Sequence, residues 1–152
     1  MANPDSVAQL YPTSFGNFAL ASASAVPLGA TGNAVVALPI LTGGLTNSGS
    51  TTGSGQVIIR RVTIQNPNTN VNTANVAILT SSDGNTSNAV VASVVLANLT
   101  ATNTYQDLTI ASPYSTTTTI TGNQTQALYV LVNTAVANAA VDIRVYGDTV
   151  SF

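Results

Sequence analysis

The side chains that could carry acid–base chemistry in this sequence are few, since only five aspartates and three arginines are charged among 152 residues. The aspartates are Asp5, Asp83, Asp107, Asp142 and Asp148, and there is no glutamate. Two carboxylates at a suitable separation could hydrolyse a glycosidic bond. Here no spacing singles out a general acid and a nucleophile, so the sequence does not indicate a glycosidase.

Histidine, cysteine, lysine and tryptophan are also absent from the sequence. Their absence excludes a Ser-His-Asp triad, a Cys–His pair and a Schiff-base lysine. It also removes the usual ligands of zinc and of iron–sulfur clusters, and the lysine of a phosphate-binding loop. We therefore expect no enzyme activity, no catalytic residue, no metal site and no cofactor.

The low charge of the chain limits the classes of partner that it is expected to bind. Charged residues make up 5% of the sequence and the net charge is −2, whereas a soluble domain usually carries about 25% charged residues. A nucleic-acid-binding protein would show a basic patch. No apolar stretch approaches the roughly 20 residues of a membrane span, and residues 1–5 do not resemble a secretory signal. We expect neither a nucleic-acid partner nor a membrane partner.

The elements that must position these charges are predicted to be short strands separated by turns. Runs of β-branched residues alternate with Gly, Asn, Pro and Asp clusters, which is typical of an all-β domain. The expected strands cover residues 34–41, 57–65, 75–80, 89–97, 104–110, 116–121, 127–133 and 141–146. Pro39 places the first of them at a sheet edge or at a bulge. About eight strands predict a single antiparallel β-sandwich or barrel formed by residues 33–152.

Two segments fall outside the strand pattern. Residues 1–32 are rich in Ala, Ser and Pro, and their aromatic side chains are Tyr11, Phe15 and Phe18. We expect this segment to be an extended N-terminal arm, because it has too few large apolar residues to form a core alone. Residues 42–56 predict a flexible loop of Gly, Ser and Thr.

Arg60 and Arg61 lie side by side within an apolar run. In a regular strand, alternation places Arg60 on the same face as Val62. Its guanidinium would then be partly buried and would need a carboxylate partner. Asp107 and Asp142, both on expected strands, are the candidate partners in this structural ion pair. A β-bulge would instead shift the register and leave both arginines in water, and a substrate-binding arginine is a third possibility.

Residues 127–132 form a strand with two apolar faces. If Leu128 and Val130 fill the core, Tyr129 and Leu131 point outward. Either a neighbouring segment of the same chain or a second subunit must then cover them. Because the chain has little charge to oppose association, we expect a homotrimer whose subunits bury Tyr129 and Leu131 around a three-fold axis.

Asp83-Gly84 between two apolar runs predicts a turn. With Asn85, the segment also places oxygen-bearing side chains at alternate positions, as the start of a calcium-binding loop does. Gly84 stands at the wrong position for that loop and no glutamate follows. A turn is therefore the expected structure.

Four stretches together resemble a known family. Residues 25–39 lead from the arm into the first strand, residues 57–67 form a strand ending in Asn-Pro, and residues 127–132 and 141–148 supply the closing strands. In texture and strand order the chain resembles the jelly-roll decoration, or cement, proteins on the heads of tailed bacteriophages. The resemblance covers most of the chain. It implies a jelly-roll-like sandwich, homotrimers on the outer surface of the virion capsid, the major capsid protein as partner, and no cofactor.

On this resemblance, the expected function is that of a structural protein that decorates and stabilises a bacteriophage capsid. The arm residues Tyr11, Phe15 and Phe18 would then bind the capsid. An alternative is a carbohydrate- or receptor-binding module of a phage fibre or spike, in which a sugar would stack on an exposed aromatic ring such as Tyr114. A domain of a surface layer or of an adhesin is a third interpretation.

Overall fold

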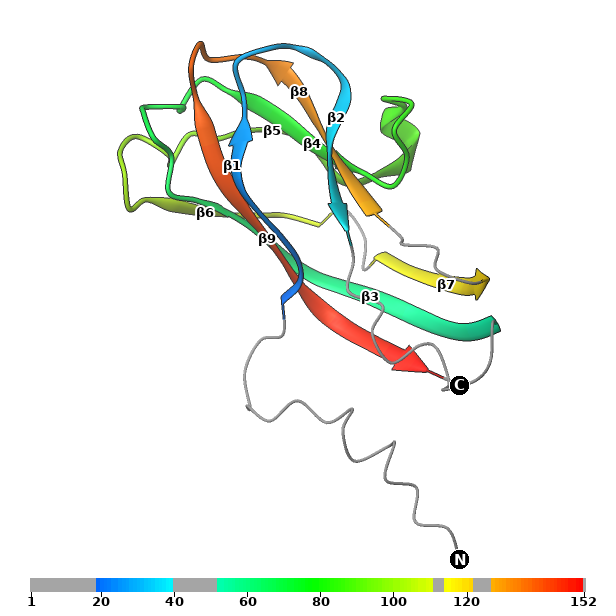
Figure 1. The fold of residues 1–152 in the computed structure, drawn as a ribbon. Coiled ribbons are helices and arrows are strands. Elements are labelled where there is room, and N and C mark those ends of the chain that lie inside the picture. Colours follow the sequence, from blue (N-terminus) through cyan, green and yellow to red (C-terminus); the bar gives the residue numbers. More distant parts are fainter. Residues whose placement is uncertain (1–18, 40–51, 111–113, 122–126, 152) are drawn as a thin grey trace, which may run out of the picture.

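The computed structural model describes residues 19–39, 52–110, 114–121 and 127–151. Their regular structure is β apart from one short 3-10 turn, η1 (Thr86–Asn88) (Figure 1). The described residues form nine strands: β1 (Ala19–Pro27), β2 (Gly32–Pro39), β3 (Thr52–Gln65), β4 (Asn75–Leu79), β5 (Ala89–Val95), β6 (Tyr105–Leu108), β7 (Tyr114–Thr121), β8 (Ala127–Thr134) and β9 (Ala140–Ser151).

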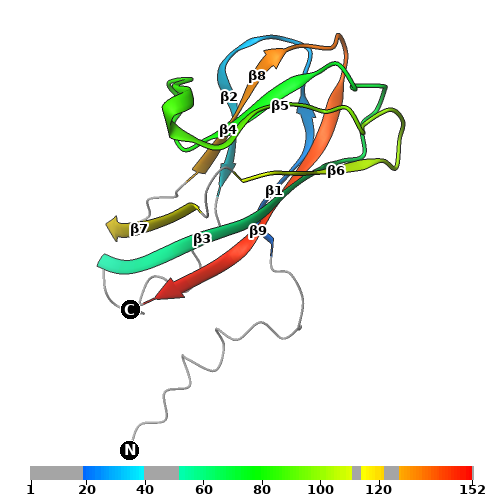
Figure 2. The same ribbon diagram turned by 180° about the vertical axis from the view of Figure 1, so that it is seen from behind.

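The strands form two antiparallel sheets, which Figures 1 and 2 show from opposite sides. Sheet A has the strand order β1-β9-β3-β6, with β7 also paired to β3, and sheet B has the order β2-β8-β4-β5. The predicted all-β sandwich is therefore confirmed. The strand count differs, because the eight expected strands correspond to β2 through β9 and β1 is an additional strand.

The strands pair in a nested order, as in one long ribbon folded back on itself. β4 pairs with β5, β3 with β6, β2 with β8, and β1 with β9. Two further pairings, of β9 with β3 and of β8 with β4, join the halves of the ribbon into the two sheets. Apart from β4 and β5, the paired strands are thus far apart in the sequence.

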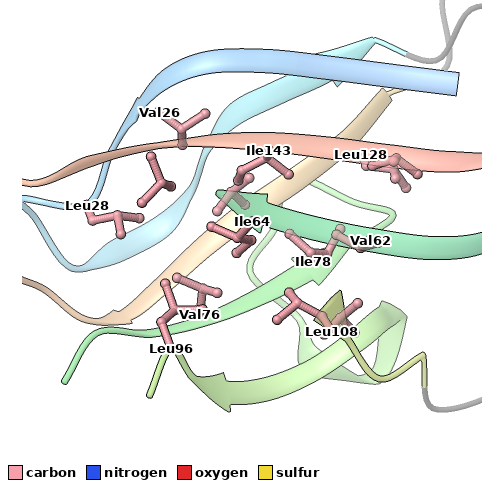
Figure 3. Packing of buried hydrophobic residues seen from close by; sticks show 14 of the residues in the cluster. Val26, Leu28, Val62, Ile64, Val76, Ile78, Leu96, Leu108, Leu128 and Ile143 are labelled. Atoms are coloured by element: carbon pink, nitrogen blue, oxygen red, sulfur yellow. The ribbon is translucent and has the colours of Figure 1, made fainter. Parts of the chain in front are cut away.

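The core lies between the two sheets and is filled by aliphatic side chains (Figure 3). The labelled residues in that view are Val26, Leu28, Val62, Ile64, Val76, Ile78, Leu96, Leu108, Leu128 and Ile143. Each such side chain contributes about 1.5–3 kcal/mol when it is fully removed from water. Because both sheets supply these residues, the core fixes the inward face of each strand that contributes to it, and alternate side chains of those strands point outward.

The first strand corrects the predicted boundary between arm and domain. Residues 19–32 belong to the sandwich, because β1 pairs with β9 and its Leu20 and Val26 are fully buried. The strand was missed because most of its side chains are Ala and Ser, and because two register shifts interrupt its alternation. Ala25, at the second shift, has a φ of 54°. Residues 1–18 lie outside the described part of the chain.

The longest strand, β3, is paired along both edges. One edge pairs with β9, while the other pairs with β7 over its first half and with β6 over its second half. Residues 52–56 were expected to be loop but belong to this strand. Opposite β3, a Cβ added at Gly147 would lie only 2.0 Å from the backbone oxygen of Ile58. Glycine is therefore required for this close approach of β3 and β9.

Candidate functional site

Four of the chain's eight charged side chains lie in one patch on the outer face of sheet A, and we call this patch the charged face. Along β9, Val141, Ile143 and Val145 are buried in the core, so the alternate side chains point outward. The same alternation applies to the second half of β3 and to β6. The charged face consists of Arg61, Thr63 and Gln65 from β3, Asp142, Arg144 and Tyr146 from β9, and Tyr105 and Asp107 from β6.

The strand register arranges these side chains in three rows. In the first row Arg61 lies opposite Tyr146. In the second row Thr63, on the central strand, lies opposite Arg144 on one side and Asp107 on the other. In the third row Gln65 occupies the same position between Asp142 and Tyr105. Neighbouring strands are about 4.8 Å apart and successive rows about 6.8 Å apart, so the three rows form one continuous patch.

Arg61 is held over an aromatic ring in the first row. Its guanidinium carbon lies 4.5 Å from the centroid of the Tyr146 ring, which is a cation–π contact. The Nε atom is buried and makes no hydrogen bond to any described residue. The ring contact limits the motion of the guanidinium, whose terminal nitrogens are the donors that bind a carboxylate in other proteins. Arg61 is therefore a candidate group for recognising an anion or an acceptor.

Asp142 anchors the third row by bonds to the β1 bulge and to the residue that follows β3. One carboxylate oxygen accepts a hydrogen bond from the Ala25 backbone N–H (3.0 Å), and the other accepts one from Asn66 Nδ2 (3.0 Å). These two bonds lower the pKa of Asp142, the Asn66 bond having the larger effect, and the charge of Arg144 lowers it further against the opposing effect of burial. Asp142 is therefore a structural anion, which ties the β1 bulge to the end of β3.

The second row has Asp107 at one end and Arg144 at the other, and the two charged side chains have different surroundings. Asp107 accepts a hydrogen bond from the Thr63 hydroxyl, and Thr63 is only 7% exposed. The hydroxyl is thus placed to hold the carboxylate rather than to meet a substrate. Arg144 is exposed, and its charge contributes to the lowered pKa of Asp142 on the same strand. Tyr105, next to this row, is 66% exposed.

The structure corrects the predicted position of Arg60. Ile59 and Val62 both face the core although they are three residues apart, which requires one extra residue in the strand. The register shift between Ile59 and Arg61 is that bulge, and it turns Arg60 outward to an exposed position. The partly buried arginine is Arg61, and it stacks on an aromatic ring instead of entering the core.

The carboxylates named as partners of Arg60 have other bonds. Asp107 bonds to Thr63, and Asp142 bonds to Asn66 and Ala25. Both carboxylates lie on the charged face. The sequence therefore predicted two residues of this face correctly, although it paired them with Arg60 and the charged face contains Arg61. Strand alternation in residues 141–146 could also have identified Arg144 and Tyr146. The opposition of Tyr146 to Arg61 depends on the β3–β9 register, which the sequence does not provide.

The predicted subunit interface lies on the outer face of sheet B, and the chain itself covers part of it. Leu131 is 8% exposed and packs with the fully buried Ala77 and Leu79, while Tyr129 is half-buried against the same cluster. No second subunit is therefore needed to bury Leu131, and the alternative of cover by the same chain is correct for this residue. Beyond the cluster, the outer face is polar, since Asn133 Nδ2 donates to Ser93 Oγ (3.1 Å) and to Asn75 Oδ1 (3.3 Å).

The turn at Asp83-Gly84 is confirmed. Gly84 has a φ of 73°, and the Asp83 carboxylate accepts the backbone N–H of Asn85 (2.9 Å), which lowers the pKa of Asp83. Among the described residues, no group of three acidic side chains could hold a metal ion. No helix in the described ranges is long and apolar enough to cross a membrane.

The predicted arm residues Tyr11, Phe15 and Phe18 lie outside the described residues, as does the side chain of Tyr114. The exposed aromatic ring that the structure does describe is that of Tyr105, which the sequence did not single out. The chain matches no protein-family model, no curated protein and no solved structure. The charged face is thus the candidate site on its geometry alone, and it offers groups for recognition.

Proposed function

We propose that this protein is a structural component of a bacteriophage virion, which decorates the outer surface of the capsid and stabilises it by binding the major capsid protein lattice. The nested strand order supports this, because two packed antiparallel sheets built from such a folded ribbon are typical of a jelly roll. Low charge supports it too, since apolar and hydrogen-bonded contacts are little affected by changing salt.

The observation that carries the proposal is the anchoring of β1. Leu20 and Val26 fix this edge strand in the core, so residues 1–18 join the body at one edge of sheet A. A segment attached to a rigid edge can lie on a partner surface without disturbing the sandwich. In the proposal Tyr11, Phe15 and Phe18 supply the apolar contacts to the capsid. Three such segments on a homotrimer would add avidity.

The test is binding to capsids that lack the protein. A full-length variant with Tyr11, Phe15 and Phe18 changed to Ala should keep the melting temperature of the wild type and lose co-sedimentation with undecorated capsids. A chain lacking residues 1–18 should behave in the same way, because both described sheets and the buried cluster between them come from residues 19–151. Co-sedimentation of both variants at the wild-type level would contradict the proposed role of these residues.

A second candidate function is saccharide binding on the charged face, as in a fibre or spike module. Tyr105 favours it, because its exposed ring lies beside the hydrogen-bonding groups of Gln65 and Asp107. An aromatic face next to amide and carboxylate oxygens suits the apolar face and the hydroxyls of a sugar. Specific binding on a glycan array that Tyr105→Ala abolishes, with no binding to capsids, would favour this function over decoration.

A further inference from the structure

We infer that the charged face is a contact between copies of this chain, in which Asp107 and Tyr105 of one copy meet Arg144 and Arg61 of the other. The contact goes beyond the proposed decoration function and does not depend on it. Copies would associate in solution without any capsid.

The first argument is the placement of opposite charges within one copy. Arg144 on β9 and Asp107 on β6 lie in the same row, but the strand between them keeps them apart. Two strand spacings amount to about 10 Å, which is too long for a direct ion pair. Arg144 is exposed, and its electrostatic interaction with Asp142 on the same strand is the last and smallest cause of the lowered pKa of that carboxyl group. A partner that offers a carboxylate to Arg144 and a cation to Asp107 would satisfy both charges.

The second argument is that another copy is such a partner. The face carries two arginines and two aspartates, so a surface of a single charge sign would be repelled by half of it. A second copy presents the complementary set automatically. Arg61 adds a second positive charge to the basic side, where its guanidinium carbon lies 4.5 Å from the centroid of the Tyr146 ring.

The acidic side also carries an exposed aromatic residue, Tyr105. Tyr105 on β6 and Val95 at the end of β5 are the large hydrophobic residues most open to water in the described chain, at 66% and 46%. Gln106 links their strands, since its Nε2 donates to the Val95 carbonyl oxygen (2.9 Å). Aromatic residues and arginine are enriched at protein interfaces. The acidic side and the basic side lie on one face, so two copies can meet with the acidic side of each against the basic side of the other, which is a two-fold contact.

The test is a charge swap in the full-length chain, read by sedimentation velocity and native mass spectrometry over the micromolar range. Arg144→Asp and Asp107→Arg each place like charges in the contact. Each should weaken association by roughly tenfold or more, since close interfacial charge pairs couple strongly. The double variant restores opposite charges in every contact, so it should associate nearly as well as the wild type.

Two further variants control for misfolding and for a charge change elsewhere on the surface. Asp107→Asn removes the charge and keeps an oxygen that can accept the Thr63 hydroxyl. It should remain folded by circular dichroism and still weaken association. Asp83→Arg makes the same charge change as Asp107→Arg in the exposed turn between β4 and β5, and it should associate like the wild type.

Three results would overturn the inference. The first is a wild-type chain that stays monomeric throughout the micromolar range. The second is normal association of the single variants Arg144→Asp and Asp107→Asn. The third is a double variant that is folded but associates as poorly as the single variants, because the charges would then face a different partner. All of these measurements are made without capsids, so their failure is separate from failure of the decoration proposal.

Discussion

On the outer face of sheet B, Leu131 packs with Ala77 and Leu79 and is almost removed from water, whereas on the outer face of sheet A, Tyr105 and Arg144 are open to solvent. Both faces are built from alternate residues of β-strands, and both would be solvent-facing in a bare sandwich. The difference is that the first carries an apolar cluster buried within the chain itself, while the second is charged and keeps Tyr105, Asp107 and Arg144 exposed. Outer-face apolar residues here stabilise the monomer, and outer-face charges are available for recognition.

The largest expected effect on the free energy of unfolding comes from a substitution at Gly147, which would disturb the β3–β9 pairing under the charged face. In Gly147→Ala the new Cβ would clash with the Ile58 backbone oxygen at 2.0 Å and with Leu20 Cδ1 at 2.7 Å. The β3–β9 pairing must then shift, which we expect to cost about 3 kcal/mol or more of unfolding free energy in urea. Gly29→Ala is the control, because its Cβ would meet Asn138 N at an ordinary 3.5 Å. Equal stability of the two variants would contradict the close approach.

The next effect separates the two outer faces directly. Leu131→Ala should lower the unfolding free energy by about 2–3 kcal/mol, because it leaves a cavity in an apolar cluster. Arg144→Ala, on the other outer face, should change it by less than about 0.5 kcal/mol. Chemical denaturation should be repeated at several protein concentrations. A Leu131→Ala loss that vanishes when the chain is dilute would mean that a subunit contact, rather than the chain itself, buries this residue.

A smaller effect concerns the carboxylate that ties the charged face to the β1 bulge. Asp142→Ala removes two hydrogen bonds to an ionised group and should cost about 1–2 kcal/mol at neutral pH. Because folding lowers the pKa of Asp142, its contribution is present above the ordinary value of 3.8 and is lost as the pH falls through the lowered value. The variant and the wild type should therefore converge in stability in acid.

Asp83→Ala is the matched control for Asp142→Ala. Its carboxylate also has a lowered pKa, but it bonds only within its own turn. Thermal melts between neutral and acidic pH should show a smaller loss for this variant. A loss for Asp83→Ala as large as that for Asp142→Ala would mean that the link to the β1 bulge contributes nothing special.

The smallest effect tests the stacked pair on the charged face. Tyr146→Leu keeps apolar bulk beside Arg61 but removes the ring, and it should cost about 0.5–1 kcal/mol. The double variant with Arg61→Gln should show that the two losses are not additive. Strict additivity in that double-mutant cycle would rule out a stabilising contact between the two side chains.

The sequence predicted the sandwich because β-branched runs mark eight of the nine described strands. It missed β1, where small side chains and two register shifts hide the pattern that Leu20 and Val26 would otherwise show. It placed Arg60 wrongly because one bulge inverts which residues face the core, and a bulge leaves no clear mark in the sequence. The rows of the charged face depend on pairing across three strands, which strand alternation alone cannot fix.

The two-faced strand β8 illustrates a different limit. The apolar character of Tyr129 and Leu131 predicted that something covers them, but not whether that cover is the same chain or another. Deciding between the two requires the path of the chain outside sheet B, which has no local signature. The exposure of Tyr105 could not be predicted for a similar reason, since a tyrosine on an edge strand can turn to either side of the sheet.

The nested strand order also has a consequence for the order of events during synthesis. β1 is made first among the described strands, yet its partner β9 is made last, so Leu20 and Val26 have no sheet to join until β9 leaves the ribosome. Only the central pair, β4 and β5, joins strands that are close in sequence. A topology dominated by such distant contacts folds slowly. While a chain waits for its own β9, the unpaired β1 is open to the β9 of a neighbouring nascent chain, so crowding on polysomes would favour strand-exchanged assemblies.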